Sequence, residues 1–271
     1  MNTEKKNVSH SDSLQAHTEL RPYWSIWYLM LRSTAWRCAL LILLILALQS
    51  GLLYLSVRHE LLIVQAGVGT LSPPEEILSD ALCGWIAALG LIGLSVVLSA
   101  FGTKQSASRL LLRLRVDEKA IFWLHTLYNF VWYLLFYGMQ LLGMLAFCYY
   151  MQKQLPQSFW TEQSLFLTWH RNHYLYSLFP FGEITRHARN LCLAFSTAAC
   201  AAGFSCRRRR GLLGLNIVAM LCLILVFFVR DAGHGVMDVM VITLCAANLA
   251  ELTVFIYRKE LPDYGYLRPK S

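Results

Sequence analysis

Residues 38–57 read CALLILLILALQSGLLYLSV, a run in which almost every side chain is apolar and none is charged. A helix rises about 1.5 Å per residue, so about 20 such residues cross a hydrocarbon layer about 30 Å thick. The stretch therefore predicts a transmembrane helix. The whole chain agrees, because 56% of its 271 residues are hydrophobic and only 15% are charged, against about 25% charged residues in a typical soluble domain.

Five further apolar segments predict an all-α, polytopic membrane bundle of about six transmembrane helices. The six predicted spans comprise residues 38–57, 81–101, 121–150, 189–205, 211–229 and 236–257. The fourth is the least apolar of the six. Its prediction depends on charge as well, because without it the four arginines at 207–210 would fall on the opposite side of the membrane from the other basic segments.

The distribution of Lys and Arg predicts the orientation. Eighteen of the 24 Lys and Arg residues lie in four segments, at residues 1–37, 102–120, 207–210 and 258–271. Since Lys and Arg in short loops are retained on the cytoplasmic side, both termini are predicted to be cytoplasmic. The chain then divides into a disordered cytoplasmic tail (1–21), a membrane domain (22–257) with a large outer loop (151–188), and a second cytoplasmic tail (258–271).

Two segments outside the spans have helical periodicity. Residues 22–34 place Tyr23, Trp24, Trp27 and Tyr28 on one face, which predicts a separate interfacial helix before the first span, since Trp and Tyr favour the headgroup zone.

The second segment is the cytoplasmic basic loop 102–120, in which Arg109 and Arg113 lie one turn apart. Asp117 and Glu118 follow, and carboxylates favour the start of a helix. The loop has two interpretations, contact with lipid phosphates or docking of a cytoplasmic partner.

The run RLRVDEK at residues 113–119, followed by Ile121-Phe122 and Tyr128-Asn129, resembles a stretch in bacterial ABC transporter permeases of the type-2 exporter class. The resemblance implies a permease subunit in the bacterial cytoplasmic membrane that works by alternating access as a homo- or heterodimer. It also implies that the loop is a coupling helix docked on a separate ATP-binding subunit. The residues that would face this subunit are Arg109, Arg113, Arg115, Asp117 and Glu118.

Two observations qualify that expectation. The chain contains no Gly-x-x-x-x-Gly-Lys-Ser/Thr phosphate loop, so ATP hydrolysis would reside in the partner. Members of the family commonly place their larger outer elements between spans five and six, whereas here the large outer loop precedes span four.

Four polar residues within predicted spans are candidates for a transport pathway, because polar groups at membrane depth often mark one. They are His125, Asn129, Asn248 and Glu251. Asn248 and Glu251 share a face of the last span. They could line a polar cavity or meet a basic residue of another span.

Other classes of protein are less well supported. No soluble basic module predicts nucleic-acid binding. No catalytic motif, cofactor motif or close set of metal ligands is apparent: Glu75-Glu76 lacks the following Arg of prenyl-type proteases, and His170 and His173 lack further ligands. We therefore expect no enzyme activity, although an intramembrane enzyme is one alternative. A non-transporting regulatory or assembly membrane protein is the other.

Overall fold

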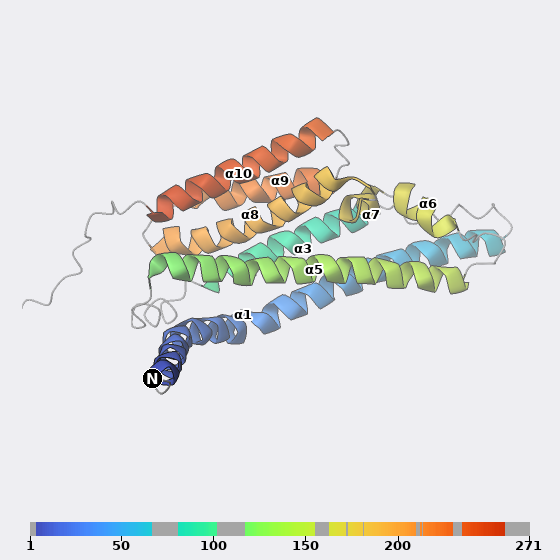
Figure 1. Ribbon diagram of the computed structural model, residues 1–271. Coiled ribbons are helices and arrows are strands. Elements are labelled where there is room, and N and C mark those ends of the chain that lie inside the picture. Colours follow the sequence, from blue (N-terminus) through green and yellow to red (C-terminus); the bar gives the residue numbers. More distant parts are fainter. Residues whose placement is uncertain are drawn as a thin grey trace, which may run out of the picture.

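The computed structural model describes residues 4–66, 81–101, 117–154, 163–171, 173–180, 182–209, 212, 214–229 and 235–257, with most of the side chains from Tyr23 onward. These parts of the chain are helical and contain no strand (Figure 1). The helices are α1 (Glu4–Gln65), α3 (Ala81–Ser99), α5 (Glu118–Gln154), α6 (Ser164–Arg171), α7 (His173–Leu178), α8 (Ile184–Arg209), α9 (Leu215–Val229) and α10 (Gly235–Tyr257).

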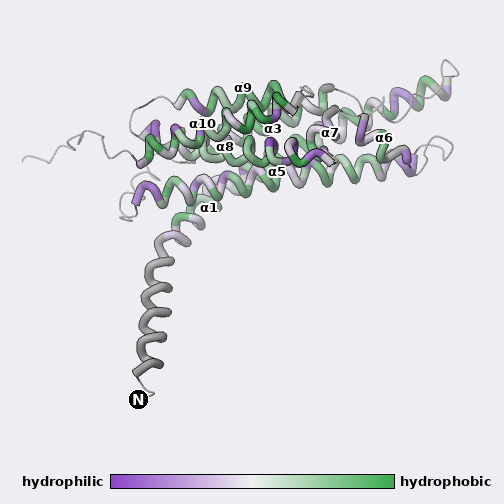
Figure 2. The backbone as a smooth tube through the Cα atoms, turned by 45° about the horizontal axis from the view of Figure 1, so that its top comes forward, coloured by the Kyte–Doolittle hydropathy of each residue, from purple (hydrophilic) through white to green (hydrophobic). Residues whose placement is uncertain are grey.

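Four of the described helices are long and apolar enough to cross a membrane. They are the Tyr23–Ile63 part of α1, the Leu82–Ser99 part of α3, and the whole of α5 and α10. Figure 2 shows that hydrophobic residues predominate along the long helices. The prediction of an all-helical membrane protein is therefore supported, and these four helices coincide with the first, second, third and sixth predicted spans.

The long helices pack side by side, and successive ones run in opposite directions (Figure 1). Contacts fix these directions. Thr34 of α1 bonds Tyr128 near the start of α5, while Asn129 of α5 bonds Ala198 in the second half of α8. One end of the bundle therefore carries Lys119, Arg207 and Arg208 and is called the basic end. The other carries α6 and α7 and is called the capped end.

The interfacial helix predicted over 22–34 and the span predicted over 38–57 form one continuous helix, α1, so their separation is wrong. This helix begins at Glu4, whereas a disordered tail was expected through residue 21. No Gly or Pro lies between Tyr23 and Ser50 to interrupt it. Ser33 and Thr34 also bond back to the Met30 carbonyl, at 3.0 and 2.9 Å, which keeps both hydroxyls satisfied inside the helix.

Helix α8 lies at the centre of the bundle, in contact with α3, α5, α9 and α10. Its middle, residues 198–202, reads AACAA, and all five side chains are buried. Such small side chains let neighbouring helices approach closely. They also explain why the predicted span 189–205 is weakly apolar: the middle of this helix is surrounded by other helices, so it does not need large apolar side chains.

The segment predicted as the large outer loop, 151–188, contains α6, α7 and the ends of two long helices. Helix α5 continues to Gln154, and α8 already begins at Ile184. Helix α7 packs into the capped end with Leu175 and Leu178 fully buried. Its Tyr174 hydroxyl donates to Gln140 at 2.6 Å and accepts from Gln49 at 3.3 Å. Burial raises the pKa of Tyr174, which keeps its proton available for the bond to Gln140.

Enlarging a side chain in the centre of α8 should destabilise the bundle. Ala198→Leu adds volume where no space is left, and we expect it to lower the free energy of unfolding by about 1–3 kcal/mol. The measurement is thermal unfolding of the purified protein in detergent. Ala246→Leu, on the exposed face of α10, is the matched control and should unfold like the wild type. Equal stability of the two variants would contradict the central position of α8.

Candidate functional site

Asp117 and Glu118 lie where α5 begins, at the basic end. The Asp117 carboxylate accepts from the backbone N–H of Lys119 at 3.4 Å, so it caps the helix, and Glu118 occupies the first turn. The prediction that these acids start a helix is confirmed. Arg109, Arg113 and Arg115, the other candidates for contact with an ATP-binding subunit, lie outside the described residues.

Asn248 and Glu251 of α10 belong to a polar cluster at the basic end. Glu251 forms an ion pair with Arg207 of α8, and Asn216 of α9 donates to both Glu251 and Asn248. Asn248 in turn donates to the Sγ of Cys200 at 3.1 Å. Of the two possibilities raised by the sequence, the structure shows the second: Glu251 meets a basic residue of another helix.

This cluster joins three helices through one arginine. The Arg207 side chain is 10% exposed and the Glu251 side chain 54%, so the cation is the more deeply placed partner. Arg207 also donates to Asn216 at 2.9 Å, and its guanidinium lies 4.8 Å from the centre of the Phe255 ring. Without Glu251 the buried charge of Arg207 would lose its counter-charge, so we assign the carboxylate a role in holding α8 against α10.

His125 and Asn129 face α8 rather than the Glu251 cluster. Asn129 donates to the Ala198 carbonyl at 3.2 Å, and the Nδ1 of His125 lies 3.4 Å from the hydroxyl of Ser205. Both side chains are buried. The four predicted pathway residues thus form two separate sets, each bonded to neighbouring helices, and none of them lines the apolar cavity described below.

A second ionic cluster, at the capped end, was not among the predicted sites. Asp238 near the start of α10 accepts from Arg189 of α8 at 2.6 Å, and the two side chains are 3% and 6% exposed. Arg186 lies 3.8 Å from the same carboxylate and also pairs with Glu183. The sequence signal was two arginines three residues apart, on one helix face.

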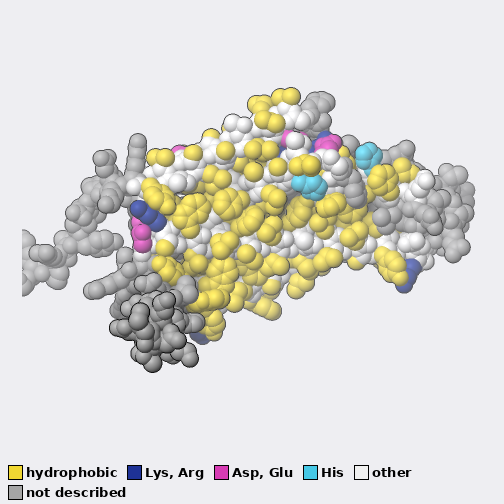
Figure 3. Space-filling view, viewed as in Figure 1, with side chains coloured by type: hydrophobic (Ala, Val, Ile, Leu, Met, Phe, Trp, Pro, Cys, Tyr) yellow, Lys and Arg dark blue, Asp and Glu magenta, His cyan; other side chains and the backbone are white. Residues whose placement is uncertain are grey.

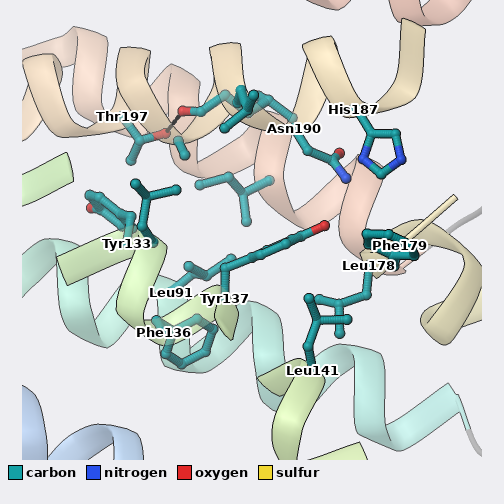
Figure 4. Close-up of a pocket in the computed structure, with 15 residues that line it drawn as sticks. Leu91, Tyr133, Phe136, Tyr137, Leu141, Leu178, Phe179, His187, Asn190 and Thr197 are labelled. Carbon is teal, nitrogen blue, oxygen red and sulfur yellow. Dashed lines mark hydrogen bonds between the residues drawn. The ribbon is translucent and has the colours of Figure 1, made fainter. Parts of the chain in front are cut away.

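An apolar cavity of about 220 Å³ lies between α3, α5, α7, α8 and α9 (Figure 4). Tyr137, His187 and Asn190 bring polar groups to its capped end, and the Tyr137 hydroxyl points toward Asn190 and His187 (Figure 4). The remaining lining is mostly apolar and comprises Leu91, Tyr133, Leu134, Phe136, Leu141, Leu178, Phe179, Leu191, Leu193, Ala194, Thr197 and Ile224. No sequence motif marks this cavity, because its walls come from five helices.

Cysteine and metal chemistry have little structural support in the described part of the chain. All eight cysteines are free, and six of them are buried. Among the residues whose positions are described, no group of three His, Cys, Asp or Glu could hold a metal ion. The side chain of His173, one of the two loop histidines, lies outside the described residues.

No family model, curated protein or solved structure matches this chain.

The Arg189–Asp238 pair should contribute strongly to stability because both partners are buried. Asp238→Leu leaves the Arg189 guanidinium without its counter-charge, and we expect a loss of about 3–5 kcal/mol in the free energy of unfolding. The double variant Arg189→Met/Asp238→Leu removes both charges and should recover most of that loss. Thermal unfolding in detergent compares the stability of the wild type, the single variant and the double variant.

Asp117→Asn is the control for this comparison. It removes an exposed carboxylate but keeps an amide oxygen that can cap α5, so its unfolding temperature should remain that of the wild type. A double variant less stable than Asp238→Leu alone would show that the pair does not carry the effect.

Proposed function

We propose that α1, α3, α5, α8, α9 and α10 are six membrane spans and that the basic end is cytoplasmic. The alternating directions of these helices support this arrangement, because the helix ends that adjoin the four segments rich in Lys and Arg lie at the basic end. Helix α9, with 15 residues, is only about 22 Å long at 1.5 Å per residue. It packs against α3 and α8, so neighbouring helices shield part of its surface.

We further propose that the protein is the membrane subunit of a bacterial ABC-type transporter, paired with a second permease subunit and driven by a separate ATP-binding subunit. The observation that carries this proposal is the position of the two residues that flank the segment 102–116. The segment connects Phe101, just after α3, to Asp117, which caps α5, and both attachment points lie at the basic end. A cytoplasmic subunit bound to Arg109, Arg113 and Arg115 would therefore act directly on two packed helices.

The packing of α5 offers a route for movement from such a subunit into the bundle. Within the first three turns of α5, His125 and Asn129 contact α8, and Tyr128 contacts Thr34 of α1. A displacement at Asp117 and Glu118 would thus reach the centre of the bundle. In alternating access, ATP binding by the partner would shift the balance between two arrangements of these helices.

One observation favours the second candidate, a regulatory or assembly protein that transports nothing. The four predicted pathway residues are bonded between helices, and the cavity between α3, α5, α7, α8 and α9 is mainly apolar. A continuous polar route is therefore not visible among the described residues. A permease built on this bundle would suit an apolar substrate better than a polar one.

Affinity purification in mild detergent, followed by mass spectrometry, separates the two candidates. We expect a protein with a phosphate loop to co-purify with the wild type and to be lost from Arg109→Glu/Arg113→Glu/Arg115→Glu, because the reversed charges repel its docking surface. The control, Arg58→Glu/Lys153→Glu, reverses exposed charges at the capped end and should retain the partner.

A well-folded wild type that brings down no such ATPase would overturn the permease proposal and leave the regulatory or assembly candidate. Equal retention by the triple variant and the control would show instead that a partner exists but does not dock on residues 102–116.

A further inference from the structure

We propose that the cavity described above binds one acyl chain of a membrane phospholipid, which enters sideways between α5 and α8 from the leaflet at the capped end. This proposal requires only that the bundle lies in a bilayer. It is independent of an ATP-binding partner.

The first argument is access. Leu134 of α5 and Leu191 of α8 line the cavity and are also 40% and 52% exposed on the outside of the bundle. The cavity therefore reaches the surface between these two helices. The face of the bundle seen in Figure 3 is covered mainly by hydrophobic side chains, as expected of a surface in contact with lipid tails. A molecule that enters here comes from the hydrocarbon layer and need not cross water.

The second argument is that the two ends of the cavity differ in polarity, the capped end being the more polar. At the capped end of the cavity lie His187 and Asn190, with the Tyr137 hydroxyl pointing toward them (Figure 4). At the deep end the polar atoms are already engaged: the Tyr133 hydroxyl lies 2.6 Å from Ser95, and Thr197 donates to the Leu193 carbonyl at 2.7 Å. A phospholipid of the leaflet at the capped end has the same polarity, with its ester groups near the interface and its chain directed toward the midplane.

The third argument is size. The cavity measures about 220 Å³. Apolar cavities of about 150 Å³ stay dry and accept small hydrocarbons, whereas pockets for whole drug-sized molecules usually measure about 300–1,000 Å³. The volume therefore suits part of a hydrocarbon chain while the rest of the molecule stays in the bilayer. Water is a poor occupant, because the deep lining offers it few free polar partners.

The polar end can recognise the region where a chain joins its headgroup. Asn190 is held in place because its amide donates to the Ser177 carbonyl at 2.9 Å and its side-chain oxygen accepts from Arg189. The His187 ring packs on Phe179, with 5.1 Å between ring centres. No hydrogen bond from this ring to the described residues is present, so its N–H can donate to an ester oxygen.

The test uses the purified protein alone, in vesicles of phosphatidylethanolamine and phosphatidylglycerol that contain a phospholipid with a photoactivatable diazirine on one acyl chain. After illumination, mass spectrometry maps the labelled residues. A diazirine in the middle of the chain should label Leu91 or Tyr133 in the cavity, and one next to the ester should label His187 or Asn190. Labelling of the exposed leucines Leu43 and Leu44 of α1 gives the reference for bulk lipid.

Filling the cavity should abolish the cavity labels and leave the α1 labels unchanged. Ala194→Phe places a ring inside the cavity, and Leu191→Phe blocks its opening on an exposed position, where folding is least disturbed. Ala246→Phe, on the outer face of α10, is the matched control and should label like the wild type. Circular dichroism and gel filtration establish that each variant is folded.

Cavity labels that persist in folded Leu191→Phe and Ala194→Phe would overturn the proposal. A wild type labelled only on outer faces such as that of α1 would also overturn it. Because no ATPase is present, none of these results bears on the docking of residues 102–116. The two proposals therefore fail separately.

Discussion

Helix α8 is fixed at both ends by arginines that reach the same neighbour. Arg189 pairs with Asp238 at the capped end, and Arg207 pairs with Glu251 at the basic end. Since both carboxylates belong to α10, the two helices must run parallel and in one register. Helix α9, which connects them in the sequence, packs against α3 and α8, and its Asn216 joins the basic-end cluster. The positions of the last three helices follow from these two ion pairs together.

The small side chains in the middle of α8 have a complementary effect. Residues 198–202 bring α5 and α10 close to the helix axis, and Asn129 of α5 bonds the Ala198 carbonyl where a bulkier neighbour would leave no room. Nearer the capped end, α5 and α8 separate around larger residues such as Leu134 and Leu191, and the cavity lies in that gap. Tight packing and the open cavity are therefore features of the same pair of helices.

The sequence predicts those parts of the fold in which a helix contacts lipid. Long apolar runs such as residues 38–57 are recognisable because leucines cover their outer surface, and the acids Asp117 and Glu118 correctly marked the start of α5. The extent of α8 was less predictable, because Arg186 and Arg189 resemble loop residues until Asp238 is brought beside them by the fold. The helix expected over 22–34 continues into the first span instead, because no Gly or Pro lies between Tyr23 and Ser50 to end it.

The candidate sites also differ in how far the sequence predicts them. The sequence indicated that Glu251 needed an explanation but could not choose between a pathway and an ion pair, because the choice depends on Arg207, 44 residues away. The cavity could not be predicted at all, since its walls come from separate helices.

The arginine pairs also have a consequence for biosynthesis in the proposed six-span arrangement. A chain made from its N-terminus presents Arg189 and Arg207 before Asp238 and Glu251 exist. In the proposed arrangement, α8 would find its counter-charges only when α10 has been made, so the last three helices would insert as one unit.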